Sequence, residues 1–204
     1  MQSSYSEKEP IKKLSVWIKW TIVATVCVPL SLMLLELGWD LVHRKLSAEF
    51  VVGILGSIAL CYLQAIILKK YVNWAWQWTL FSLIGIALWT ILFGLIYFVN
   101  PNLYMNNAMG GALIGGILGL MQWLVLRKRI KRAALWIISS TIGWSIGLMA
   151  AEIPWMELLG LASEMIVLVV LISVVSSGAI VGGITGCGLI WILGDISSRR
   201  EVLD

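Results

Sequence analysis

Long apolar runs follow one another along nearly the whole of this chain, separated only by short polar segments. A helix rises about 1.5 Å per residue, so roughly 20 apolar residues cross the ~30 Å hydrocarbon core of a bilayer. The composition agrees, since 60% of the 204 residues are hydrophobic and only 13% are charged. The sequence therefore predicts an all-α membrane protein, one transmembrane domain over residues 1–204. The runs lie at 16–37, 48–68, 78–99, 109–126, 134–151 and 164–194.

The last run, 164–194, is 31 residues long, enough for one tilted helix or two short ones. Lys and Arg are enriched in cytoplasmic flanks of membrane helices. Six spans place four basic flanks on one side, with His43, Arg44 and Lys45 as a small exception outside, whereas seven would separate the tail from the others. We therefore predict six spans, both termini in the cytoplasm, and an outer interfacial stretch at 155–163. The basic flanks are Lys12 and Lys13, Lys69 and Lys70, the loop 127–132, and Arg199 and Arg200.

Several residues recur at intervals of 58 positions, among them Trp20, Trp78 and Trp136. Internal periods of this length are typical of arrays built from one supersecondary unit. The pattern predicts three tandem two-helix repeats of about 58 residues, the third carrying nine extra residues. Two helices per repeat leave all three in the same orientation, related by an axis along the membrane normal. The repeats run approximately over 12–69, 70–127 and 128–195.

A second aromatic follows each of these tryptophans after 19 residues, which is about 28 Å of helix. Amphipathic rings concentrate at the two membrane–water interfaces. The spacing predicts that both sets of aromatics mark the interfaces, rather than a cofactor-stacking site. The second set is Trp39, Tyr97 and Trp155.

Small residues recur every four positions on the second helix of each repeat, so they share one helix face. Such faces let two membrane helices approach closely. We predict a neighbouring first helix as the partner, with lipid, pigment or another subunit as alternatives. On this view Gly115→Leu disrupts packing and Gly115→Ala is mild. The predicted helix-packing residues are Gly53, Ser57, Cys61, Gly111, Gly115, Gly119, Gly178, Gly182 and Gly186.

Reactive groups are scarce in this sequence. It contains no nucleophile motif, no phosphate-binding loop and a single histidine, and its three cysteines have no zinc-like spacing. We therefore predict a protein that is not an enzyme and holds no metal or cofactor. The basic run 127–132 lies between two spans, which favours topology and contact with anionic membrane lipids over nucleic acid. An acidic protein partner remains an alternative for this run.

Several polar residues are candidates for an ion or ligand site. Glu164 opens the last apolar run, where a carboxylate suggests an ion path unless the helix simply begins beside it. Gln64 and Gln122 occupy equivalent positions, and we expect their amides to bond to Ser139, Ser140, Thr21 or Thr79. Structural bonding is the first interpretation and ligand binding the second. The candidate ion or ligand residues are Glu36, Glu152, Glu164, Gln64, Gln122 and His43.

Residues 111–147 carry a glycine-spaced helix, the run Gln-Trp-Leu-Val-Leu-Arg, a basic turn, and a Trp-containing helix with Gly-Trp. This segment resembles a Gly- and Trp-rich repeat family of cyanobacterial-type membrane proteins. The resemblance extends to the other repeats more loosely, through Gln64 and the glycines of 178–188. It implies a bacterial inner membrane or a thylakoid membrane. It implies no particular activity.

Three functions fit these features. The grooved helices and the lack of reactive groups favour a non-catalytic protein that packs against or scaffolds a larger membrane complex. A small-solute or ion transporter is the second hypothesis, because parallel helix-pair repeats and outer carboxylates also occur in carriers. Pigment binding through Gln64, Gln122 or His43 is the third.

Overall fold

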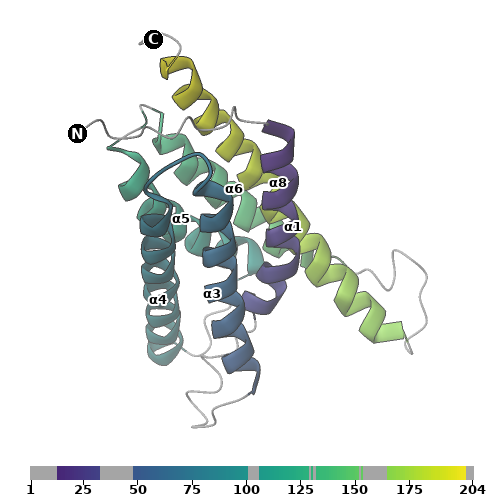
Figure 1. Cartoon of the computed structure of the whole chain (residues 1–204). Coiled ribbons are helices and arrows are strands. Elements are labelled where there is room, and N and C mark those ends of the chain that lie inside the picture. The colour runs from purple at the N-terminus through teal and green to yellow at the C-terminus, as the bar shows by residue number, and fades with distance from the viewer. Residues whose placement is uncertain are drawn as a thin grey trace.

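The computed structural model describes residues 13–32, 48–100, 106–128, 130, 132–151, 153 and 165–200. Within these ranges the chain forms six α-helices and no strand (Figure 1). The predicted all-α class and the six helix positions are therefore confirmed. The helices are α1 (Lys13–Leu32), α3 (Ala48–Leu68), α4 (Ala75–Val99), α5 (Asn107–Leu126), α6 (Ala134–Ala151) and α8 (Ile166–Arg200).

Five of these helices are long and apolar enough to cross a membrane. The apolar part of α3, Val52–Leu68, is shorter than the other five and reaches only the lower limit of the length that spans a bilayer, about 17 residues. Side chains such as Ile22, Tyr62 and Ile91 are more than half exposed. An apolar exterior of this kind is compatible with lipid as the surrounding solvent and indicates a multi-pass integral membrane protein.

The helices form a closed ring. Contacts join α1 to α3, α3 to α4, α4 to α5, α5 to α6 and α6 to α8, and α8 returns to α1. The α5–α6 and α1–α8 contacts are the most extensive, and the α3–α4 contact is the least. Consecutive helices run in opposite directions (Figure 1). Because the ring closes, the first helix of the chain lies beside the last.

The last apolar run forms one helix. The 35 residues of α8 continue without interruption from Ile166 to Arg200. From Ser177 onward α8 packs against α1 and α6, whereas its first third, residues 166–176, stands apart from the other helices (Figure 1). The single helix agrees with the prediction based on charge.

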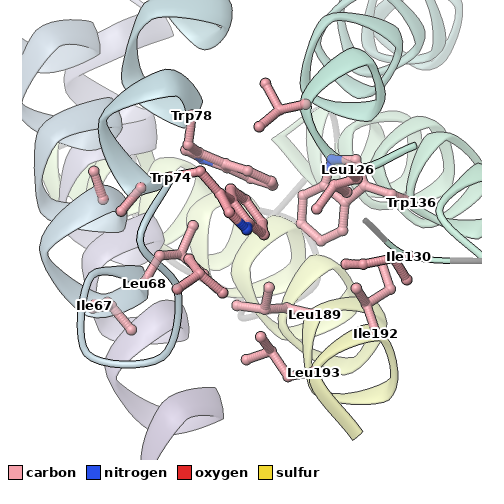
Figure 2. Packing of buried hydrophobic residues seen from close by; sticks show 14 of the residues in the cluster. Ile67, Leu68, Trp74, Trp78, Leu126, Ile130, Trp136, Leu189, Ile192 and Leu193 are labelled. Atoms are coloured by element: carbon pink, nitrogen blue, oxygen red, sulfur yellow. The ribbon is translucent and has the colours of Figure 1, made fainter. Parts of the chain in front are cut away.

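A hydrophobic cluster fills one end of the ring. It combines the starts of α1, α4 and α6 with the ends of α3, α5 and α8, including Leu68, Leu126 and Leu193. Trp78 and Trp136 point toward one another within it (Figure 2). Because all these helix ends meet here, the exposed basic residues that flank them gather at this same end. We call it the basic end; its described cations are Lys13, Lys69, Lys70, Arg127, Lys128 and Arg132.

The predicted interfacial position of the first aromatic set is wrong. Trp20, Trp78 and Trp136 are each at most 1% exposed, and their rings face into the bundle rather than toward lipid. Inside the bundle each indole makes edge-to-face contact with other rings and finds an acceptor for its N–H, as a buried tryptophan requires. Trp39 and Trp155, from the second set, lie outside the described residues, as does the side chain of Tyr97.

Candidate functional site

Three tryptophans meet at the centre of the bundle, one each from α1, α4 and α6. The ring centroids of Trp20, Trp78 and Trp136 lie 5.0 to 6.0 Å apart, and their planes cross at 68° to 87°. This edge-to-face arrangement matches the positive ring edge of one indole to the negative face of the next. We call these three residues the tryptophan triad.

Each indole N–H of the triad donates to a side chain on another helix. Trp78 Nε1 donates to Gln64 Oε1 at 3.3 Å, and Trp136 Nε1 donates to Gln122 Oε1 at 2.7 Å. Trp20 Nε1 donates to Thr185 Oγ1 at 3.0 Å. The acceptors come from α3, α5 and α8, so the three bonds join the six helices of the ring in three pairs. A buried indole N–H normally needs such an acceptor, which accounts for these polar groups in an apolar core.

The predicted partners of the two glutamines are wrong. Gln122 donates from Nε2 to Ser82 Oγ at 2.8 Å, in addition to accepting from Trp136. The partners do lie on first helices of the predicted repeats, as expected, but they are the tryptophans and Ser82. Among the expected partners, Thr79 donates to the Cys61 carbonyl and Ser139 bonds within α6, while Thr21 Oγ1 is buried without a partner.

Thr185 is the site residue that sequence reasoning missed. Leu189 occupies the position equivalent to the glutamines once the insertion is counted, so no acceptor was expected in the third repeat. Thr185 lies one helical turn earlier and supplies the hydroxyl instead. Its own proton goes to the Val181 carbonyl at 2.6 Å, so the oxygen accepts from Trp20. A search for polar residues within one helical turn of Leu189 would have identified Thr185.

The glycines of α5 and α8 lie where backbones approach closely. A Cβ at Gly115 would lie 2.6 Å from the Ser140 carbonyl oxygen of α6, and one at Gly182 would lie 2.8 Å from Thr21 Cα of α1. Both distances are too short for any added carbon, so the expectation that Gly115→Ala is mild is wrong. The remaining glycines of the two predicted faces are Gly111, Gly119, Gly178 and Gly186, each against α6 or α1.

The equivalent face of α3 has bulkier residues. Gly53, Ser57 and Cys61 are buried. Ser57 donates to the Gly53 carbonyl of its own helix at 2.9 Å, and the Cys61 carbonyl accepts from Thr79 of α4 at 3.3 Å. Side chains occupy two of these three positions, and the contact of α3 with α4 is the least extensive of the six around the ring.

A cavity of about 50 Å³ lies at the centre of the ring, beside the triad, and residues of all six helices line it. Its polar lining comes mainly from hydroxyls, the two glutamines and the indole of Trp89. Trp89 is 3% exposed, and its Nε1 has no hydrogen-bond partner. The structure therefore brings Gln64 and Gln122 together at one cavity.

The other predicted ion or ligand residues lie outside the described part of the chain. Their role therefore stays a prediction. They are Glu36, His43, Glu152 and Glu164. Within the residues that the structure describes, no group of three His, Cys, Asp or Glu side chains could hold a metal ion. Cys27 and Cys61 are buried, whereas Cys187 is exposed.

These features define the class of protein as a multi-pass helical membrane protein with a hydrogen-bonded aromatic centre. The chain matches no protein-family model, no curated protein and no solved structure.

Proposed function

We propose that this chain is a non-catalytic integral membrane protein that packs against another membrane protein through the first third of α8. The observation that carries the proposal is the isolation of that part, residues 166–176, from the other helices of the bundle. We call this segment the α8 arm.

The length of α8 supports the proposal. Its apolar part, Val167–Gly194, has 28 residues, about 42 Å of helix, so it fits a ~30 Å hydrocarbon core only when strongly tilted. The part of α8 that follows the arm is fixed against α1 and α6 through Gly178, Val181 and Gly182. Tilt about that fixed part carries the α8 arm sideways into the membrane, away from the ring.

The surface of the α8 arm also supports the proposal. Val167 is 78% exposed, and Val170 and Leu171 are both more than half exposed. These positions are three and four residues apart, so they share one face of the helix, and that face is exposed. Ser173 donates back to the Val169 carbonyl of its own helix. The exposed apolar face presents van der Waals surface on which a neighbouring membrane helix can pack.

Photo-crosslinking in native membranes tests the proposal. A benzophenone amino acid at Val170 should give an adduct with a different membrane protein of defined mass. The matched control is the same substitution at Ile138, which is 53% exposed on α6 and far from the arm in sequence. We expect lipid adducts alone at that position. Lipid adducts alone at both positions, from correctly folded protein, would contradict the proposal.

We also propose that the ring consists of three copies of one helix pair around a pseudo-three-fold axis. Two spacings support it. The triad tryptophans are 58 residues apart, and both glutamines accept from the tryptophan 14 residues later. The proposal also makes α3 the sixth membrane span. The reason is that α3 supplies the acceptor for Trp78 in the same way as α5, which is long enough to span, supplies the acceptor for Trp136.

The basic end supports a proposal for orientation. Positive flanks face the cytoplasm in most membrane proteins, so we place the basic end and both termini there. Anionic headgroups at that surface would attract the exposed Lys69, Lys70 and Lys128. The resemblance to cyanobacterial-type proteins supports a bacterial inner membrane or a thylakoid membrane. Cysteines placed at Lys70 and Lys128 should react with a membrane-impermeant reagent only from the cytoplasmic side.

A further inference from the structure

A groove of about 510 Å³ lies on α8 at the basic end, and it shares no lining residue with the central cavity. Its volume is within the range of about 300–1,000 Å³ that is usual for ligand pockets. The exposed or half-buried residues of α8 in its lining are three or four positions apart, so they form one face of the helix. They are Cys187, Ile190, Trp191 and Gly194.

Two cations complete the lining, Lys13 at the start of α1 and Arg132 just before α6. The Lys13 ammonium lies beside Gly194, because a Cβ added to this glycine would be 3.4 Å from Lys13 Nζ. The Arg132 guanidinium lies over the ring of Trp191, 5.8 Å from its centroid. Such a cation–π contact restrains the guanidinium and uses none of its five N–H donors.

The charge of the groove favours an anion. Lys13 and Arg132 are both exposed, and neither makes an ion pair with a residue that the structure describes. The described lining contains no acidic residue, so it carries two positive charges. A guanidinium offers paired N–H donors to phosphate oxygens, and an ammonium adds a compact charge. The groove is therefore suited to a phosphate group.

The depth of the groove favours a lipid as the carrier of that phosphate. The apolar spans of α1 and α8 end at Lys13 and Gly194, so the two cations lie at the level of the headgroups. Cys187 is seven residues from Gly194, which is about 10 Å of helix toward the bilayer centre. Trp191 lies between these levels, where amphipathic rings are typical of the interface. The groove is thus charged at headgroup depth and carries Ile190 and Cys187 below it.

We propose that this groove binds an anionic phospholipid of the surrounding bilayer. Its phosphate lies between Lys13 and Arg132, and an acyl chain continues along the face of α8 toward Cys187. This is a defined site, in contrast to the general attraction of the basic end for anionic headgroups. It rests on the membrane class of the chain, and not on the α8 arm or on which side of the membrane the basic end faces.

Protection of Cys187 from an uncharged maleimide tests the proposal, because this thiol is exposed in the groove while Cys27 and Cys61 are buried. The full chain in mild detergent, freed of copurified lipid, receives equal amounts of phosphatidylglycerol or phosphatidylcholine. Intact mass follows the modification. We expect phosphatidylglycerol to slow it about tenfold more than phosphatidylcholine does, since only the former is anionic.

Two double variants of equal charge identify the cations that matter. Lys13→Gln with Arg132→Gln should abolish the difference between the two lipids. The matched control is Lys19→Gln with Arg127→Gln, which should keep the difference. Arg127 also lies over a tryptophan, 5.0 Å from the centroid of Trp123, but outside the groove. Rates are compared between lipids within each variant, so a direct effect of the cations on the thiol cancels.

Four results would overturn the proposal. Absence of protection by phosphatidylglycerol would mean that the groove does not hold this lipid. Equal protection by both lipids would mean that acyl chains cover the groove without recognition of charge. Equal loss in both double variants would indicate only the general attraction of the basic end. Protection by glycerol phosphate at the same concentration would make a soluble phosphate compound the occupant. Failure of the crosslink at Val170 would count against the α8 arm alone.

Discussion

Trp20 donates its indole proton to Thr185 across 165 positions of sequence, at a distance of 3.0 Å. This bond joins the first helix of the chain to the last, just as the bonds of Trp78 and Trp136 join α4 to α3 and α6 to α5. The closure of the ring thus rests on one hydroxyl group as well as on the close contact of α1 with the glycines of α8.

Removing that hydroxyl should weaken the ring. Thr185→Val keeps the shape of the side chain but leaves the Trp20 N–H buried without an acceptor, at a cost of about 1–3 kcal/mol. Thr185→Ser, which retains the hydroxyl, should lose much less. Unfolding in mixed micelles with increasing dodecyl sulfate measures both. Equal stability of the Val and Ser variants would mean that the Trp20 bond contributes nothing.

The two glutamines should differ in importance. Gln122→Leu breaks two buried bonds, to Trp136 and to Ser82, and should cost roughly 1–3 kcal/mol. Gln64→Leu breaks one longer bond, to Trp78 at 3.3 Å, and should cost about 1 kcal/mol or less.

A double-mutant cycle isolates the Gln122–Trp136 bond from other effects of the glutamine substitution. Gln122→Leu and Trp136→Phe should show a coupling of about 0.5 kcal/mol or more in the same unfolding measurement. Strict additivity would show that the two side chains do not stabilise one another.

Two neighbouring glycines of α5 give a matched pair. Gly115→Ala places a carbon 2.6 Å from a backbone oxygen of α6, so α5 and α6 must separate, at a cost of about 1–3 kcal/mol. At Gly116 the nearest atom, Thr141 Oγ1, is 3.6 Å from the added carbon, which is ordinary contact. Gly116→Ala should therefore leave the thermal unfolding midpoint unchanged. A similar loss of stability in both variants would mean that the close contact of α5 with α6 is not centred on Gly115.

The cysteines should react selectively. Cys187 is exposed, whereas Cys27 and Cys61 are buried in the bundle. A small maleimide added to the folded protein in mild detergent should modify one thiol per chain, as measured by intact mass. Cys187→Ser should remove that modification, and denaturation should expose the other two. Rapid modification of more than one thiol in the folded state would contradict the burial of Cys27 and Cys61.

The helices were predictable from sequence because hydropathy depends on composition alone. Each apolar run became a helix near its expected ends, and Asn106 shows why α5 begins where it does, since its side chain accepts from the Met109 amide at 2.8 Å. The charge pattern also favoured a single last helix, which α8 confirms.

The inward face of each helix was not predictable in the same way. In lipid the outer surface is as apolar as the core, so Trp78 in the core and Trp76 on the outside look alike in sequence. The 58-residue interval related the triad tryptophans to one another without saying that their rings touch. The acceptor role of Thr185 also depended on three-dimensional placement, because the insertion shifted the third repeat out of register.

The position of α8 beside α1 sets a condition on synthesis. Ribosomes add about 5–20 residues per second, so Trp20 waits roughly 10–30 s for Thr185, 165 residues later, to be made. During that interval the polar edge of its indole and the surface that α8 will cover face lipid or the insertion machinery. A nascent chain that stalls before α8 therefore exposes the side of α1 that α8 normally covers, and a membrane chaperone or protease can recognise that surface. In a completed chain the same surface is buried.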